Sequence, residues 1–196
     1  PGLEDQKYAS HLWMADLTGG ARPFTHGKAS DGGARWSPDG RAIAFVRTQD
    51  EIAQIHTIDC AGGESRPLTA LEAGSIACLD WFADGSGIVF TYRAAPKKNP
   101  AARRVTELWY KVEAMGYWDG SYAQIRAVDL HGRVTKLTEE KNSVGEVRGS
   151  PDGELLAYTG VLTPGGEAEL WVMRRDGSGR RRIPRPRPTP LMAVHP

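Results

Sequence analysis

Hydrophobic and polar residues alternate along most of the chain in short runs, and glycine or proline separates one run from the next. Residues 54–58 (QIHTI) show the alternation with a period of two, as expected when successive side chains of a strand point to opposite faces. The 23 glycines and 13 prolines favour many short elements joined by tight turns. The pattern predicts an almost entirely β protein, with no helix longer than about two turns.

An internal repeat organises these short runs. Three segments share one frame, WSPDGRAIAFV (36–46), WFADGSGIVFT (81–91) and GSPDGELLAYT (149–159). Their Asp-Gly pairs begin at Asp39, Asp84 and Asp152, which are 45 and then 68 residues apart, so the second interval holds one period and an insertion of 23 residues. A second set of segments interleaves with the first, and each is followed by a glycine-containing turn and a short strand: HLWMAD (11–16), QIHTID (54–59), QIRAVD (124–129) and ELWVMR (169–174).

Each repeat predicts four antiparallel strands. In Ser37-Pro38-Asp39-Gly40, proline fixes the first turn position, aspartate bonds back to the backbone and glycine takes the positive φ that closes a hairpin. Four strands in about 40–45 residues are the signature of a β-propeller blade. The predicted units are a half-blade (11–25) and three blades (31–69, 75–138 with an insertion at 93–121, and 144–183), followed by a Pro/Arg-rich tail (184–196). Because propellers close with about 4–8 blades, residues 1–183 are predicted to form an arc of three and a half blades.

Residues that recur at equivalent positions are predicted to be structural. Asp16, Asp59 and Asp129 end equivalent strands, which favours a role in turn geometry over catalysis. Trp13 and Trp171 are equivalent to each other, as are Trp36 and Trp81, and these tryptophans are predicted to pack one blade on the next.

The repeat resembles the propeller repeats of TolB-like proteins and of the prolyl oligopeptidase family of serine peptidases. Residues 103–129 (RRVTELWYKVEAMGYWDGSYAQIRAVD) look like a segment of the acylaminoacyl-peptidase branch, with Gly116, Tyr117, Asp119 and Gly120 matching its Gly-Tyr-x-Asp-Gly turn. The resemblance implies a propeller that lies over a separate α/β-hydrolase domain and admits only small or flexible peptides to the catalytic serine.

The chain departs from that family because it contains no G-x-S-x-G nucleophile elbow. We therefore expect no catalytic residue and no peptidase activity in these residues themselves; the parent protein is expected to be a serine peptidase. The function expected from the resemblance is a non-catalytic propeller that gates peptide access and packs on the hydrolase domain. The alternative is a TolB-like propeller that acts as a platform for protein–protein interaction. A carbohydrate-acting or lactonase-type propeller enzyme is disfavoured, because no inward-pointing carboxylate and histidine set recurs at the blade starts.

The insertion contains the candidate substrate-binding residues. Aromatic and cationic side chains gather there and could bind the backbone or carboxylate of a peptide: Arg103, Arg104, Trp109, Tyr110, Lys111, Tyr117 and Trp118. The simpler interpretation is a hairpin that covers the edge of the ring or packs on a partner domain. Both interpretations remain open from the sequence.

Charge, apolar runs, histidines and cysteines disfavour several other functions for the chain. The net charge is +1, and the arginine-rich end (174–187, net +6) lacks interleaved aromatic residues, so an extended solvated tail is favoured over a nucleic-acid site. No apolar run is long enough for a membrane span, and the five scattered histidines predict neither a metal site nor a cofactor. Cys60 and Cys78 form no disulfide framework, which favours a cytoplasmic protein. The open blade edges also predict either a larger ring or self-association.

Overall fold

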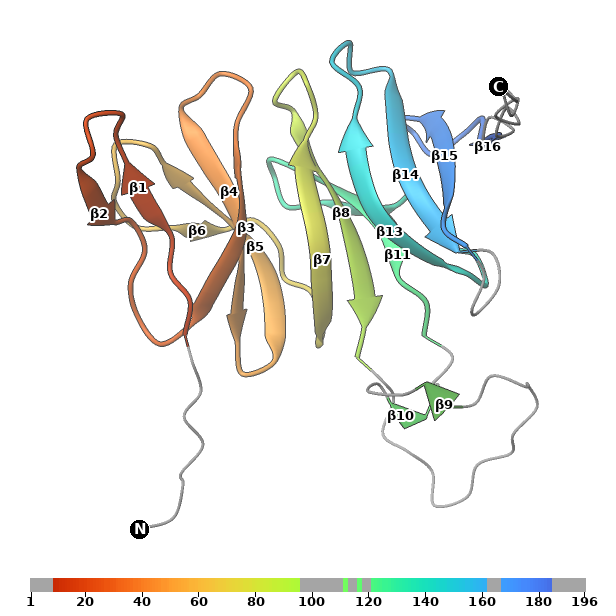
Figure 1. The fold of residues 1–196 in the computed structure, drawn as a ribbon, viewed down its shortest axis with the longest axis horizontal. Helices are drawn as coiled ribbons and strands as arrows, with labels where there is room; N and C mark the ends of the chain where they lie inside the picture. The colour runs from red at the N-terminus through yellow and green to blue at the C-terminus, as the bar shows by residue number, and fades with distance from the viewer. Residues whose placement is uncertain (1–8, 96–110, 113–115, 118–120, 162–166, 185–196) are drawn as a thin grey trace, which may run out of the picture.

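The computed structural model describes residues 9–95, 111–112, 116–117, 121–161 and 167–184. Within these ranges every regular element is a β-strand, and the sheets stand side by side from the N-terminal to the C-terminal end (Figure 1). The prediction of an all-β propeller arc of about three and a half antiparallel blades is confirmed.

The strands group into a half-blade and three blades. The half-blade contains β1 (Trp13–Ala15) and β2 (Ala21–Pro23). Blade 1 contains β3 (Ser30–Trp36), β4 (Ala42–Gln49), β5 (Ile52–Asp59) and β6 (Arg66–Pro67). Blade 2 contains β7 (Gly74–Trp81), β8 (Gly87–Ala94), β11 (Gln124–Asp129) and β12 (Val134–Lys136). Blade 3 contains β13 (Ser143–Gly149), β14 (Leu155–Val161), β15 (Glu169–Arg174) and β16 (Arg181–Ile183).

The turn between the first two strands of a blade has the predicted chemistry. In blade 1, the Gly40 amide donates to the Ser37 carbonyl (2.9 Å), and Gly40 has a φ of 70°. The Ser37 hydroxyl donates to Asp39 Oδ1 (2.6 Å) and accepts from the Ala42 amide (2.9 Å). These bonds close the hairpin within six residues, which explains why the motif recurs at the same place in each repeat.

The aspartates that end the third strands are structural, as predicted. Asp16 Oδ1 accepts from the amides of Thr18 and Gly20, at 2.8 and 3.0 Å. Asp59 and Asp129 accept equivalent backbone bonds, the former from Ala61. Such bonds fix the turn that leads into the fourth strand.

The hydrophobic core lies between neighbouring blades in three layers. The first layer joins the half-blade to blade 1 and includes Phe24, Ile43 and Phe45. The second joins blades 1 and 2 through Ala44, Ile55, Leu79, Trp81, Ile88, Phe90, Tyr92 and Val128. The third joins blades 2 and 3 through Phe82, Val89, Ile125, Leu137, Val144, Val147, Leu156, Tyr158 and Met173. Each blade is therefore stabilised by its neighbours rather than by a core of its own.

The predicted packing role holds for two of the four tryptophans. Trp81 is buried, and its Nε1 donates to the Arg35 carbonyl of the preceding blade (3.1 Å). Trp171 is half-buried, stacks on Tyr158 of its own blade and packs against the core layer between blades 2 and 3. The prediction is wrong for Trp13 and Trp36, whose exposed fractions are 65% and 56%. The described half-blade has no first strand to face Trp36, and this explains the difference from Trp81.

A threonine after the fourth strand closes each of the first three units. The Thr25, Thr69 and Thr138 hydroxyls accept the amides of Leu12, Ile55 and Ile125, at 3.0, 2.9 and 2.8 Å. In blade 3 the equivalent residue is Pro184, which has no hydroxyl to accept such a bond.

Candidate functional site

The predicted substrate-binding residues lie mostly outside the described residues. Only the backbone of Lys111 and Tyr117 is described, in β9 (Lys111–Val112) and β10 (Gly116–Tyr117), where the two residues pair directly. The other five (Arg103, Arg104, Trp109, Tyr110 and Trp118) lie beyond the described ranges. This short antiparallel pair lies beyond the ends of β8 and β11 (Figure 1). A binding role for the insertion stays a prediction.

The first strands of the three blades form the inner surface of the arc. Strands β3 and β13 both contact β7. Each of the three strands contains a β-bulge, and the three lie close to one another in the repeat: between Gly32 and Arg35, between Ile76 and Cys78, and between Val144 and Val147. A bulge bends its strand and re-aims the adjacent side chains. Three bulges in neighbouring strands therefore shape one surface.

A hollow of about 330 Å³ runs along these bulges. Its wall combines the small residues Gly32, Gly33 and Ala77 with three charged residues, which are Arg35, Glu146 and Arg148. Arg148 Nη2 lies 3.6 Å from Glu146 Oε2, and both side chains are exposed, so their ion pair is weak and both can reorient towards a ligand. Two guanidinium groups and an exposed carboxylate can bind the charged ends or backbone of a peptide.

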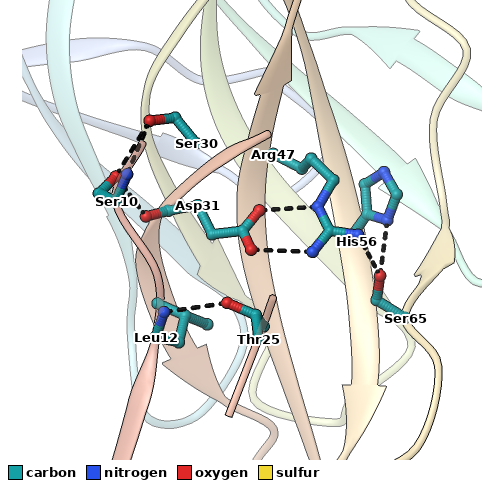
Figure 2. Close-up of polar contacts among 8 residues, drawn as sticks. All are labelled: Ser10, Leu12, Thr25, Ser30, Asp31, Arg47, His56 and Ser65. Atoms are coloured by element: carbon teal, nitrogen blue, oxygen red, sulfur yellow. Dashed lines mark hydrogen bonds and ion pairs between the residues drawn. The ribbon is translucent and has the colours of Figure 1, made fainter. Parts of the chain in front are cut away.

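Behind this wall lies a buried ion pair in blade 1 (Figure 2). The Asp31 carboxylate is fully buried and accepts Nε and Nη2 of Arg47, at 2.7 and 2.8 Å. These hydrogen bonds raise the pKa of Arg47. The Arg47 guanidinium also lies 5.3 Å from the centre of the Phe45 ring. Bidentate geometry makes this a strong pair, and it leaves one guanidinium nitrogen, Nη1, for another partner.

That partner is Ser65, which also contacts His56 (Figure 2). Arg47 Nη1 donates to Ser65 Oγ (2.8 Å), and His56 Nδ1 lies 3.2 Å from the same oxygen. Burial and the Arg47 charge lower the pKa of His56, which keeps the ring neutral so that Nδ1 can accept the Ser65 proton. Asp31 bonds Arg47 rather than His56, so the group lacks the carboxylate that orients a triad histidine. The cluster connects β3, β4 and β5 of blade 1 to Ser65.

Sequence reasoning missed the Asp31–Arg47 pair, although the repeat contains a signal for it. Asp31 pairs with Arg47 in register, whereas the equivalent pairs are Ile76 with Tyr92 and Val144 with Gly160. A charged pair at a position that is uncharged in the other two blades could have been found by aligning the repeats.

The described part of the chain also bears on metal binding and on membrane insertion. No group of three or more His, Cys, Asp or Glu side chains there is arranged to hold a metal ion. None of the described elements is a helix that could cross a membrane.

The comparisons with known proteins agree with this geometry. The chain is 34% identical over 174 residues to the uncharacterized peptidase YuxL of Bacillus subtilis, a match that spans 82% of the chain. The chain is a β-propeller of the peptidase family. The match covers 26% of the length of the Bacillus protein, so this peptidase propeller spans only part of that relative. No family model matches the chain.

Solved structures show the same fold. The peptidase propeller matches the acylaminoacyl peptidase of Pyrococcus horikoshii with a TM-score of 0.60 and 18% identity, over 87% of this chain and 27% of that one. TolB of Acinetobacter baumannii matches with a TM-score of 0.61 and 19% identity, over 88% and 37% of the two chains. At these identities the likeness concerns the fold alone.

Proposed function

We propose that this propeller lies over an α/β-hydrolase domain in its parent protein and limits which peptides reach the catalytic serine. The observation that carries the proposal is the 34% identity to a peptidase of which this chain spans only a part. The inner hollow supports it, because Arg35, Glu146 and Arg148 present charge of both signs where a peptide would pass. In this role the propeller selects substrates and takes no part in bond cleavage.

The non-catalytic role of the propeller can be tested with a fluorophosphonate probe, which labels activated serines. The 196-residue chain is expected to stay unlabelled, because a nucleophile needs a positioned base and the Ser65–His56 contact lacks an orienting carboxylate. The parent protein is expected to be labelled at one serine outside these residues. Stoichiometric labelling of the isolated chain would overturn the assignment of a non-catalytic role.

Gating is tested in the parent protein with peptides of increasing length. Short peptides are expected to be cleaved, and the same sequence within a folded protein is expected to resist cleavage. The double variant Arg35→Gln, Arg148→Gln is expected to raise KM for peptides with charged ends more than for blocked peptides. Arg181→Gln, on the outermost strand of blade 3, is the matched control. It is expected to leave the KM values for both kinds of peptide unchanged. Equal cleavage of short peptides and folded proteins would refute gating.

A platform for protein–protein interaction is the second candidate. The fold match to TolB, with a TM-score of 0.61, favours it as much as the match to the acylaminoacyl peptidase favours gating. Two results together would support this candidate. The probe would leave the parent protein unlabelled, and the parent protein would bind another protein only when the propeller is present.

A further inference from the structure

Two arginines on the wall of the inner hollow occupy the same place in their blades. Arg35 of β3 and Arg148 of β13 each stand immediately before the last residue of the strand, and both line the hollow. Nη1 of each guanidinium donates to the carbonyl oxygen of the preceding residue, at 2.8 Å for Arg35 and 2.9 Å for Arg148. The two side chains therefore make the same local contact, and each keeps further N–H groups for a ligand.

The equivalent residue of blade 2 is Asp80, whose carboxylate binds backbone amides. Asp80 Oδ1 accepts from the amide of Trp81 (3.1 Å), and Oδ2 accepts from the amide of Gly149 (3.3 Å). Among the described residues, no ion pair joins Asp80 to Arg35 or to Arg148. Asp80 is thus engaged with the backbone of blades 2 and 3, and both arginines stay available for another carboxylate.

The other acidic groups leave the hollow with an excess of positive charge. The Asp31 side chain is fully buried against Arg47, so it does not meet a ligand in the hollow. Of the described residues that line the hollow, Glu146 alone presents an exposed carboxylate, and its contact with Arg148 is long (3.6 Å) and weak. Two guanidinium groups and one carboxylate give an excess of one positive charge, which favours an anionic ligand.

The rest of the wall fits the end of a peptide chain. Ser30 and Arg35 lie near opposite ends of β3, five residues apart, which is about 16 Å along an extended strand. Val46 and Ile76 add apolar surface to the wall, and the Ser10 hydroxyl lies 3.3 Å from that of Ser30 (Figure 2). An extended peptide end of about three residues spans about 10 Å, so it fits along this wall with hydroxyl groups near its other end.

We propose that the inner hollow binds the free C-terminal carboxylate of a short peptide, which accepts hydrogen bonds from Arg35 and Arg148 while the last side chain packs on Val46 and Ile76. The proposal rests on the proposed function in taking a peptide as the ligand, and it names the class of peptide that the hollow selects. The fork of guanidinium donors matches a planar carboxylate, and such charge-assisted bonds are stronger than those between neutral groups. The positively charged amino end of a peptide is disfavoured by the excess positive charge.

The test measures binding of small peptides to the 196-residue chain by isothermal titration calorimetry. N-acetyl-Gly-Leu carries a free carboxylate, N-acetyl-Gly-Leu-amide carries no charged end, and Gly-Leu-amide carries only a free amino group. The acid is expected to bind about tenfold more tightly than either amide. The double variant Arg35→Gln, Arg148→Gln is expected to remove this preference. Arg181→Gln, at an exposed arginine of β16, is the matched control and should retain it.

Three further measurements locate the site. A Cβ on Gly32, which lies on the wall, would meet no atom within 4 Å beyond its chain neighbours, so Gly32→Phe is expected to fold, to fill the hollow and to abolish binding of the acid. Glu146→Gln should tighten binding of the acid, because Arg148 then loses its competing carboxylate. Bound acid should also slow the alkylation of Cys78, on the same wall, several-fold. Cys60, beside the core layer of the half-blade and blade 1, should keep its rate.

Three outcomes would overturn the proposal. They are equal affinity for the acid and its amide, no binding of either, and a preference for the acid that survives in the double arginine variant. None of them decides the gating test, because that test compares short peptides with folded proteins and does not depend on a free carboxylate. A failure of this proposal is therefore distinguishable from a failure of gating.

Discussion

Replacing Arg47 by alanine should destabilise blade 1 far more than an ordinary surface substitution does. The Asp31 carboxylate is fully buried, so the variant leaves a buried charge without its bidentate partner. Breaking such a pair costs about 3–5 kcal/mol, against a total stability of about 5–15 kcal/mol for a typical domain. At about 2–4 °C per kcal/mol for a chain of this size, the midpoint of thermal unfolding should fall by roughly 6–20 °C.

The repeat also supplies a rescue. The double variant Asp31→Ile, Arg47→Tyr installs the register pair that blade 2 has in Ile76 and Tyr92. Because replacing a buried ion pair by apolar residues is often neutral or stabilising, the double variant should recover most of the loss. Both variants are measured by urea unfolding, with Arg41→Ala as the exposed control, expected within about 0.5 kcal/mol of the parent chain. A loss below about 1 kcal/mol for Arg47→Ala, or a double variant no better than the single one, would refute the reasoning.

Three further outcomes follow from the structure. Trp81→Ala should lower the free energy of unfolding by about 3–5 kcal/mol, whereas Trp36→Ala, at a site that is 56% exposed, should cost much less in the same urea titration. Gly74→Ala should be destabilising by about 1–3 kcal/mol, because its Cβ would lie 2.5 Å from a carbonyl oxygen of β8. The hydrogen bond from Arg175 holds the pKa of Asp84 well below its usual range. The ion pair therefore stabilises the folded chain above the ordinary aspartate pKa, and this stabilisation is lost as the pH falls through the lowered pKa of Asp84. Arg175→Met should therefore flatten the acid side of a plot of melting temperature against pH.

The parts of the fold that sequence could predict are those set by local chemistry. The Ser37–Gly40 turn and the Asp129 turn are closed by bonds between residues at most five positions apart. Such contacts can be read directly from the order of residues. The repeat then extends each local prediction to the other blades, which is why the arc could be predicted as a whole.

Long-range partners could not be predicted in the same way. Trp36 and Trp81 occupy the same place in the repeat, yet only Trp81 faces the first strand of a preceding blade. Asp31 and Arg47 are unremarkable surface-type residues until the register of β3 and β4 places them opposite each other. The exposure of side chains at equivalent positions depends on which blade lies beside them, and the sequence of a single repeat does not contain this information.

The placement of the core in layers between blades has a consequence for how the arc comes apart. Because each layer is shared by two units, the stability of the whole is close to a sum of nearest-neighbour terms, as in a linear array of repeats. Blades 1 and 2 each contribute to two layers, whereas blade 3 contributes to one among the described residues. Unfolding should therefore begin at the two flanks and spread inward, so that amide exchange is slowest in β4, β5, β7 and β8.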